Sequence, residues 1–272
     1  MKRFKLALGQ MTVVGGEIEG NVQRAVRMIS AAADAGAKVV LLPEALDVGW
    51  MNPNARMLAT AIPDGRTCLT LRAAAQRSNI YVCAGLTERA GDAVFNAAVL
   101  ISPAGEVVLH HRKLNELEIG HDVYGQGDRL GVAQTPLAAF GLMICADGFA
   151  RGQVVSRTLG LMGADVILAP SAWAVAPDYD NAATPYGALW RENFGAVARD
   201  FRLWVAACSN VGRITGGPWD DHLCIGCSLV VGPEGNPALT GPFGERAETL
   251  LTIDIKPEPR PARGTGWDAR WR

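Results

Sequence analysis

Cys145 stands at the end of a run of strand-forming apolar residues, within "FGLMICADGF". A buried cysteine usually lies inside such a run, where it behaves as a small hydrophobic residue. Cys145 instead closes the run, and Gly148 marks the turn that follows. Reactive groups of α/β proteins are displayed at such strand ends, so Cys145 is a candidate nucleophile. A cysteine nucleophile needs a base and a charge stabiliser from elsewhere in the chain.

Two further strand ends carry titratable side chains. Glu44 follows the apolar run in "LLPEALDVGW", where folding does not require an acid; a helix cap or a solvated loop is the alternative interpretation. In "VVLHHRKLNELE", strand alternation points His111 and Lys113 the same way, so one of them faces a site. Periodicity alone does not choose between the two. The other basic residues of this run, His110 and Arg112, are expected on a solvated edge.

The composition is that of a soluble globular protein. Of the 272 residues 49% are hydrophobic and 19% are charged, and the net charge is −1. This length can form one large domain with a sizeable core. The near-neutral charge, without a basic block, argues against a nucleic-acid partner. No apolar run is long enough for a bilayer, and the N-terminal one is too short for a secretory signal, so we expect a cytoplasmic protein with no membrane partner.

The six cysteines are expected to be free thiols in a reducing compartment. Cys224 and Cys227 have C-x-x-C spacing, but no second pair of ligands follows at zinc-finger distance. The surrounding residues predict a strand, on which positions three apart face opposite ways. The sequence therefore predicts no metal site.

Three segments of the first half recur, in the same order, in the second half. "AGAKVVLLPEA" resembles "MGADVILAPSA", "AAAQRSNIYVCAGL" resembles "GAVARDFRLWVAACSN", and "AAVLISPAGEV" resembles "CSLVVGPEGNP". The first pair aligns Glu44 with Ser171 at corresponding strand ends. Hydrophobic periodicity predicts helices at 19–36, 152–162 and 186–200, and strands at 4–14, 38–42, 80–86, 94–101, 106–111, 138–145, 165–169, 203–208, 223–231 and 249–255.

Helices that alternate with strands in this way pack outside a sheet. Two similar halves favour an α/β fold in which two sheets stack as a four-layer α-β-β-α sandwich; a single doubly wound sheet is the alternative. We predict one domain over 1–255. Residues 256–272 are rich in proline and contain Trp267 and Trp271, which predicts an extended C-terminal arm packed on the body or on a partner subunit.

The three strand ends together resemble the nitrilase superfamily of carbon–nitrogen hydrolases, in its amidase-like branch. The resemblance is carried by "LLPEA" with Glu44, "HHRKLN" with Lys113 and "GLMICAD" with Cys145, and it extends to 190–212 and 226–237. It implies the α-β-β-α sandwich, a homodimer or a larger homo-oligomer, a small-molecule amide substrate, and no cofactor.

The resemblance also implies roles for these residues. Lys113 would favour the Cys145 thiolate, and Glu44 would accept the thiol proton as general base. The Lys113 ammonium and the N–H of Ala146 would stabilise the oxyanion, and one such donor is typically worth ~3 kcal/mol of barrier. A thioester on Cys145 would then be hydrolysed by water that Glu44 deprotonates.

The sequence departs from the family pattern at a second glutamate that often follows the lysine. The position expected for it holds Gly120; we assign the role to Glu118, with Glu116 as the other candidate and His121 as a substitute polar group. Asp147, two residues after the cysteine, favours amides over nitriles.

Several residues are expected to contact substrate. Ser171 and Trp173 resemble residues that line the family's cleft, beside the Ala146 N–H, although packing is an equal alternative for Trp173. Trp50 and Tyr124 are candidate walls. Arg151 and Arg191 are candidates for a carboxylate contact.

Other functions stay open at this point. An N-carbamoyl amide hydrolase or a nitrilase would use the same three residues. A papain-like enzyme would need His222 beside Cys145, although its flanking residues do not fit that class. A binding protein that keeps the fold without turnover is the alternative from another class. The identity of the amide is not determined by the sequence.

Overall fold

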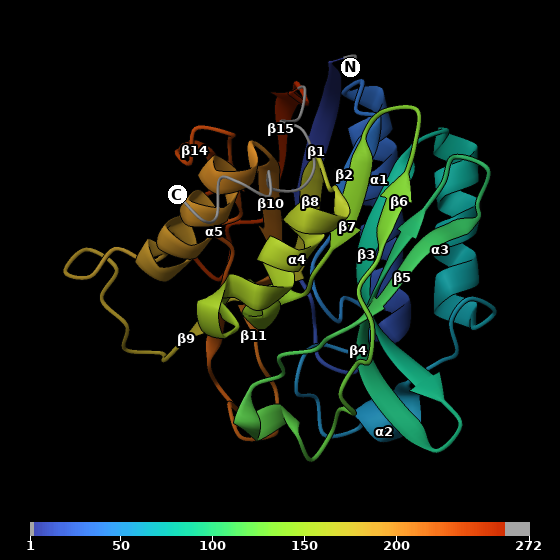
Figure 1. Ribbon diagram of the computed structural model, residues 1–272. Coiled ribbons are helices and arrows are strands. Elements are labelled where there is room, and N and C mark those ends of the chain that lie inside the picture. Colours follow the sequence, from blue (N-terminus) through green and yellow to red (C-terminus); the bar gives the residue numbers. More distant parts are fainter. Residues whose placement is uncertain (1–2, 259–272) are drawn as a thin grey trace.

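Two six-stranded sheets lie face to face in the computed structural model, which describes residues 3–258 (Figure 1). The first sheet has the order β15 (Thr249–Ile255), β1 (Phe4–Gln10), β2 (Val39–Leu41), β3 (Tyr81–Ala90), β4 (Ala93–Ile101), β5 (Val107–Arg112). The second has the order β14 (Pro237–Thr240), β13 (Leu229–Val231), β10 (Trp204–Ser209), β8 (Val166–Ser171), β7 (Ala139–Leu142), β6 (Val132–Gln134). A small third sheet contains β11 (Val211–Arg213), β12 (Leu223–Ile225) and β9 (Ala174–Val175).

Helices cover the outer faces of both large sheets. Figure 1 shows α1 (Ile18–Asp34) and α3 (Arg66–Ser78) on one side, and α4 (Val154–Met162) and α5 (Ala188–Phe201) on the other. The remaining helical segments are short: α2 (Ala55–Leu58) and the 3₁₀ turns η1 (Glu118–Gly120), η2 (Cys145–Phe149) and η3 (Arg151–Gln153). The predicted α-β-β-α sandwich is confirmed.

The two sheets repeat one topology. In the first, β1, β2 and β3 are parallel, and β4, β5 and β15 pair antiparallel to their neighbours. In the second, β7, β8 and β10 are parallel, and β13, β14 and β6 pair antiparallel. The repeated sequence segments fall on equivalent strands, β2 with β8, β3 with β10 and β4 with β13, which explains why they recur in the same order.

The core between the sheets follows from strand alternation. Leu6 and Leu8 belong to the inter-sheet core, whereas Ala7 between them belongs to the core under α1 and α3. Phe4 of β1 packs edge to face on Phe140 of β7, with ring centroids 5.9 Å apart. Burial on both faces explains why these strands are continuous apolar runs.

Several strands are shorter than predicted: β1 ends at Gln10 instead of residue 14. Two of the other differences have a backbone cause. The strand predicted over 138–145 ends at Leu142, and Cys145 begins η2 with φ 41°. The strand predicted over 223–231 is divided between β12 and β13 because Gly226 and Cys227 have φ of 65° and 58°. Such positive φ values interrupt an extended strand.

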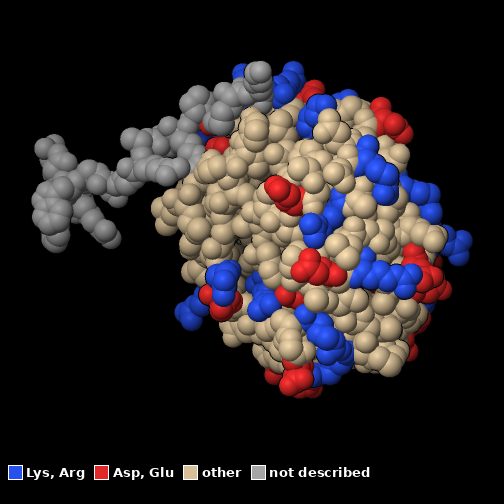
Figure 2. All heavy atoms as spheres, turned by 90° about the vertical axis from the view of Figure 1, so that its right-hand side faces the viewer, with Lys and Arg blue, Asp and Glu red and all other residues tan. Residues whose placement is uncertain are grey.

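The start of the predicted C-terminal arm lies along the second sheet. The Lys256 carbonyl accepts a hydrogen bond from Trp204 Nε1 (3.1 Å), and Glu258 pairs with Arg202 (2.6 Å). The rest of the arm, with Trp267 and Trp271, lies outside the described residues. No helix within 3–258 is long and apolar enough to cross a membrane. Figure 2, which faces the right-hand side of Figure 1, shows Lys and Arg mixed with Asp and Glu.

Candidate active site

Three strands of the two sheets bring the predicted residues to one end of the sandwich. Glu44 follows β2, Lys113 follows β5, and Cys145 begins η2 just after β7. The Glu44 N–H donates to the carbonyl of Ser171 (3.2 Å), so the ends of β2 and β8 meet as their sequence similarity predicts. Gly85 of β3 allows the Glu44 loop to pass closely, since a Cβ there would lie 2.5 Å from the Glu44 Cα.

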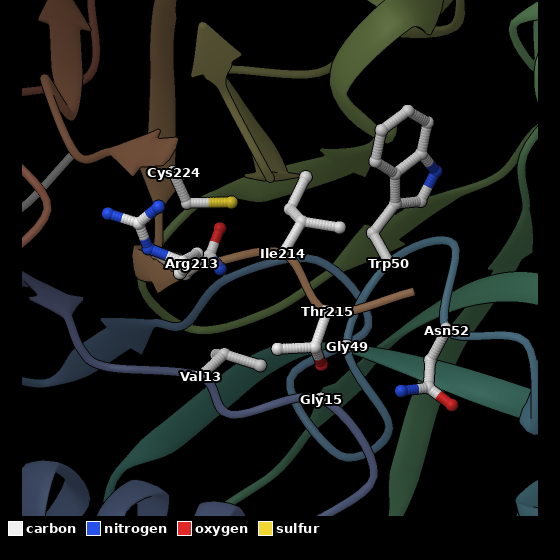
Figure 3. Close-up of a pocket in the computed structure, with 10 residues that line it drawn as sticks. Val13, Gly15, Gly49, Trp50, Asn52, Arg213, Ile214, Thr215 and Cys224 are labelled. Carbon is white, nitrogen blue, oxygen red and sulfur yellow. The ribbon is translucent and has the colours of Figure 1, made fainter. Parts of the chain in front are cut away.

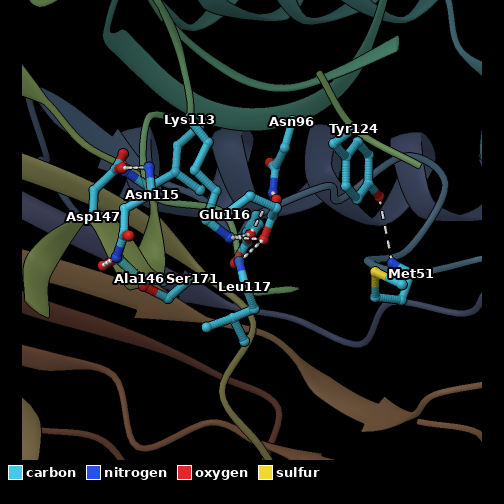
Figure 4. A network of polar contacts seen from close by, with 12 residues as sticks. Met51, Asn96, Lys113, Asn115, Glu116, Leu117, Tyr124, Ala146, Asp147 and Ser171 are labelled. Atoms are coloured by element: carbon cyan, nitrogen blue, oxygen red, sulfur yellow. Dashed lines mark hydrogen bonds and ion pairs between the residues drawn. The ribbon is translucent and has the colours of Figure 1, made fainter. Parts of the chain in front are cut away.

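Lys113 is bound between two carboxylates. Its Nζ lies 2.8 Å from Glu44 Oε1 and 2.8 Å from Glu116 Oε1, and the three side chains are 2%, 1% and 4% exposed. Asn96 of β4 donates from Nδ2 to Glu44 Oε1 (2.7 Å) and to Glu116 Oε2 (2.9 Å). Figure 4 shows Lys113, Glu116 and Asn96 in this network. One ammonium and one amide therefore hold two buried carboxylates together.

Burial and charge together set the protonation of the site. Burial lowers the pKa of Lys113, but the carboxylates of Glu44 and Glu116 outweigh it and hold that pKa above its usual range. Burial raises the pKa of Glu44, and Lys113 only partly opposes this. Lys113 is therefore a fixed cation beside a carboxylate of increased proton affinity.

The surroundings of Cys145 favour the protonated thiol. Burial and then the Glu44 carboxylate raise its pKa well above the usual range, while Lys113 and the N–H of Ala172 lower it. Lys113 thus favours the thiolate, as expected, but its effect is outweighed. The arrangement places a protonated nucleophile, a strong carboxylate base and a cation side by side.

Residues 5–261 match the family described as carbon-nitrogen hydrolase. The chain belongs to the carbon–nitrogen hydrolase family. It is a member of the nitrilase superfamily, as its sequence resemblance implies, and acts on non-peptide C–N bonds.

Relatives of this hydrolase are named for both nitrile and amide chemistry. A nitrilase of Pyrococcus abyssi is 32% identical over 256 residues, which are 92% of this chain and 90% of that protein. The chloroplastic omega-amidase of Arabidopsis thaliana is 27% identical, and the match covers 94% of this chain and 68% of that protein.

An amidase from Nesterenkonia sp. has the same fold, with a TM-score of 0.78 at 22% identity over 93% of this chain and 90% of that one. Mutants of that amidase have been solved with acrylamide and with butyramide. Another mutant of it carries the acetamide moiety of fluoroacetamide, added covalently at its active-site cysteine.

The second carboxylate on the lysine of this hydrolase is Glu116, not Glu118. The Glu118 side chain is exposed, and it makes none of the side-chain hydrogen bonds or ion pairs found within 3–258. His121 is also exposed, with its Nε2 3.3 Å from the Glu116 carbonyl. A Cβ at Gly120 would lie 2.7 Å from the Glu116 Cγ and 3.0 Å from its Cδ. Glu116 therefore fills the space into which a side chain at position 120 would project.

Strand alternation brings both His111 and Lys113 inward, which answers the question left open by the sequence. His111 is buried, and its Nε2 lies 2.8 Å from the Asp147 carboxylate. His222 instead stacks on Trp219 (5.0 Å between centroids), and Trp219 packs on Trp50. The structure thus provides no Cys–His pair of the papain type through His222.

The expected substrate contacts are buried residues that also serve packing. The Ser171 hydroxyl donates to the Ala169 carbonyl (3.1 Å), and Trp173 stacks on Trp190 (4.7 Å). The Ala146 carbonyl accepts from Asn115 Nδ2 (2.7 Å), and none of the side-chain or loop hydrogen bonds found within 3–258 uses the Ala146 N–H.

Of the two candidate walls, Trp50 lies beside the lysine, and Tyr124 bonds to the backbone of Met51. Trp50 lies with its ring centroid 5.8 Å from Lys113 Nζ, and the Tyr124 hydroxyl accepts from the Met51 N–H (3.4 Å; Figure 4). Trp50 also borders a separate pocket that Cys224 and Arg213 help to line (Figure 3). None of the three central residues lines this pocket.

Asn96 is the site residue that the sequence analysis missed. It is the one amide in the apolar strand "AVFNAAVLI", and its side chain is buried. A polar side chain on the buried face of a strand needs partners, which is the signal that could have found it.

Proposed function

We propose that this hydrolase cleaves the C–N bond of a small linear amide through a thioester on Cys145, releasing ammonia and a carboxylic acid. The observation that carries the proposal is the Lys113 ammonium held 2.8 Å from the Glu44 carboxylate beside a buried thiol. Relatives named as amidases support amide hydrolysis, and Asp147, two residues after the cysteine, favours amides over nitriles.

Attack begins with proton transfer from the Cys145 thiol to Glu44. Glu44 Oε1 already accepts from Lys113 and Asn96, whereas Oε2 accepts no hydrogen bond from the residues of 3–258, so Oε2 receives the proton. The Cys145 sulfur then bonds to the amide carbon, and the carbonyl π pair moves to oxygen. Lys113 and the N–H of Ala146 stabilise this oxyanion.

Glu44 returns its proton to the amide nitrogen as the C–N bond breaks, and ammonia leaves a thioester on Cys145. Water then loses a proton to Glu44 and attacks the thioester carbon. The C–S bond breaks, the sulfur regains a proton from Glu44, and the carboxylic acid departs. Each proton passes through the carboxylate of Glu44, consistent with general acid–base catalysis by a single residue.

Glu116 performs the role that the sequence analysis gave to Glu118. Its contacts with Lys113 and Asn96 orient the same groups that bind Glu44. Removing it leaves the ammonium with one carboxylate and allows Lys113 to move, so Glu116 acts on the reaction through Lys113.

Glu116→Ala is expected to lower kcat/KM by about 10- to 100-fold, as a 1 Å displacement at a reacting group can. Adding Gly120→Glu should recover part of the loss, because a side chain at 120 projects into the vacated space. Gly120→Glu alone should be inactive or poorly folded, since two carboxylates would compete for one place. Steady-state kinetics of the three variants measure this. If Glu116→Ala and Glu116→Ala/Gly120→Glu lose kcat/KM equally, a carboxylate at position 120 cannot replace Glu116, and this explanation is refuted.

The proposed reaction is tested by ammonia release from short amides, N-carbamoyl amino acids and nitriles, with Cys145→Ala as the blank. Acid quenching during turnover, followed by peptide mass mapping, should find an acyl group on Cys145. Cys227, which is partly exposed, serves as the internal control peptide. Release from nitriles alone would replace the amide assignment by a nitrilase. Release without any acyl-Cys145 would refute the thioester.

We also propose that the hydrolase forms a homodimer through α4 and the start of α5. Four large apolar side chains of these helices are exposed: Val154, Leu161, Met162 and Leu189. The helices α4 and α5 pack on each other, and exposed apolar surface on neighbouring elements marks interaction sites. Sedimentation of the wild type and of Leu161→Glu tests this, with Met57→Glu, equally exposed on α2, as the control.

The cytoplasm remains our proposed compartment. All six cysteines are free thiols in the structure, and five of them are buried. Free thiols persist in a reducing environment, which supports this location. Fractionation of the native host cells would test it.

A further inference from the structure

We propose that Asp147 is a positioning residue, whose carboxylate links the Cys145 turn by hydrogen bonds to the segment that carries Lys113. The inference rests on the proposed function, because it concerns how the nucleophile and the cation of that reaction keep their separation. Within the described residues, no hydrogen bond or ion pair joins Asp147 to Lys113 or to the Cys145 sulfur, so it acts through the backbone.

Each carboxylate oxygen of Asp147 accepts two hydrogen bonds. Oδ1 accepts from the N–H groups of Leu114 (3.0 Å) and Asn115 (2.8 Å), which follow Lys113 directly. Oδ2 accepts from the N–H of Ile144 (2.9 Å) and from His111 Nε2 (2.8 Å). The side chain is fully buried. One carboxylate therefore joins the residues on either side of Lys113 to the residue before Cys145.

A second bond crosses in the opposite direction. Asn115 donates from Nδ2 to the carbonyl of Ala146 (2.7 Å; Figure 4). The two segments are thus joined by a side chain from each, and both bonds end on backbone groups adjacent to the reacting residues. This fixes the peptide units around Cys145 as well as the course of the chain after Lys113.

The backbone at Cys145 requires such support. Its φ of 41° lies in the left-handed region, which is unfavourable for a non-glycine residue and persists only where the surrounding structure enforces it. Asp147 closes the turn from both sides, because its N–H donates to the Ile144 carbonyl (2.9 Å) while its Oδ2 accepts from the Ile144 N–H. The carboxylate that binds the lysine segment therefore also stabilises the strained turn that carries the thiol.

The charge of Asp147 suits four donors. Burial opposes ionisation, but the hydrogen bonds from His111 and from the backbone N–H groups outweigh it, so the pKa of Asp147 lies below its usual range. An ionised carboxylate accepts at both oxygens, whereas an amide of the same shape accepts at one. Whichever way the amide is turned, Asp147→Asn places an NH₂ group against at least one backbone N–H donor.

Asp147→Asn is expected to lower kcat by about 10- to 100-fold with a smaller change in KM, and to shift the pH profile of Cys145 alkylation by iodoacetamide. The matched control is Asp165→Asn. Asp165 is also buried and accepts a backbone hydrogen bond, from Ala139 (2.8 Å), at the opposite end of β7 and β8. The control should lose stability but keep kcat and the alkylation profile.

Asn115→Ala provides a second variant, because Asn115 is only half-buried and its loss removes the crossing bond alone. It should shift kcat and the alkylation profile in the same direction by a smaller factor, even if Asp147→Asn fails to fold. Unchanged kcat and alkylation in folded Asn115→Ala would overturn the proposal. A wild type that hydrolyses no amide would refute the proposed function. Alkylation needs no substrate, so it would still test the positioning role of Asp147.

Discussion

Glu44→Gln is expected to lower kcat by about 10³-fold while making the Cys145 thiol easier to ionise. The substitution is isosteric, and the amide oxygen can still accept from Lys113 and Asn96, as Glu44 Oε1 does at 2.8 and 2.7 Å. The NH₂ group takes the place of Oε2 and cannot accept a proton. Loss of a general base typically costs 10²- to 10⁴-fold in rate.

The expected decrease in the pKa of the Cys145 thiol follows from the charges around it. Burial and the Glu44 carboxylate both raise the pKa of Cys145, and Lys113 lowers it. Glutamine removes the second contribution and leaves the others, so the alkylation profile of Cys145 should move to lower pH as turnover falls. If Glu44 only supported the fold, its substitution would not lower kcat and at the same time make the Cys145 thiol easier to ionise.

Ammonia release and iodoacetamide alkylation, each as a function of pH, measure the two effects. Glu118→Gln is the matched control, because Glu118 is an exposed glutamate of the same segment and should leave both unchanged. If Glu44→Gln kept its turnover, Glu44 would not be the base. A thiol pKa that rose in Glu44→Gln would show that the carboxylate does not face the sulfur.

The main parts of the site could be predicted because each is a local interruption of a simple pattern. Glu44 and Cys145 each end an apolar run and Lys113 ends a strand-like run, and a side chain at the end of such a strand is displayed at the edge of the sheet. The sandwich could be predicted because equivalent strands of the two halves keep similar sequences. These inferences need only the hydrophobic periodicity of the sequence and the position of each residue along the chain.

Glu116 could not be separated from Glu118 in this way. Both follow Lys113 in a segment without helical or strand periodicity, and the choice depends on the space beside Gly120, which Glu116 fills. The protonation of Cys145 is likewise a sum of burial and four nearby groups, and its sign depends on their distances. Asn96 needed knowledge of which face of β4 is buried. Three-dimensional proximity decides all three cases.

Lys113→Met is expected to destabilise the fold by about 3–5 kcal/mol and to lower kcat by at least ~10²-fold. The side chains have similar length, so packing changes little, but Glu44 and Glu116 lose the ammonium that lies 2.8 Å from each. Removing one partner of a buried ion pair leaves an uncompensated charge at about that cost. Removing one oxyanion donor typically costs 10²- to 10³-fold in kcat.

The double variant Lys113→Met/Glu116→Gln separates these two effects. It removes one of the two uncompensated carboxylates, so urea unfolding should show that part of the stability returns. Ammonia release should not return, because the donor to the oxyanion is still missing. Lys38→Met, on the surface, is the control for loss of a lysine and should change neither measurement. A double variant that regained turnover would show that Lys113 acts only by neutralising Glu116, whereas one no more stable than Lys113→Met would show that charge is not the cause of the instability.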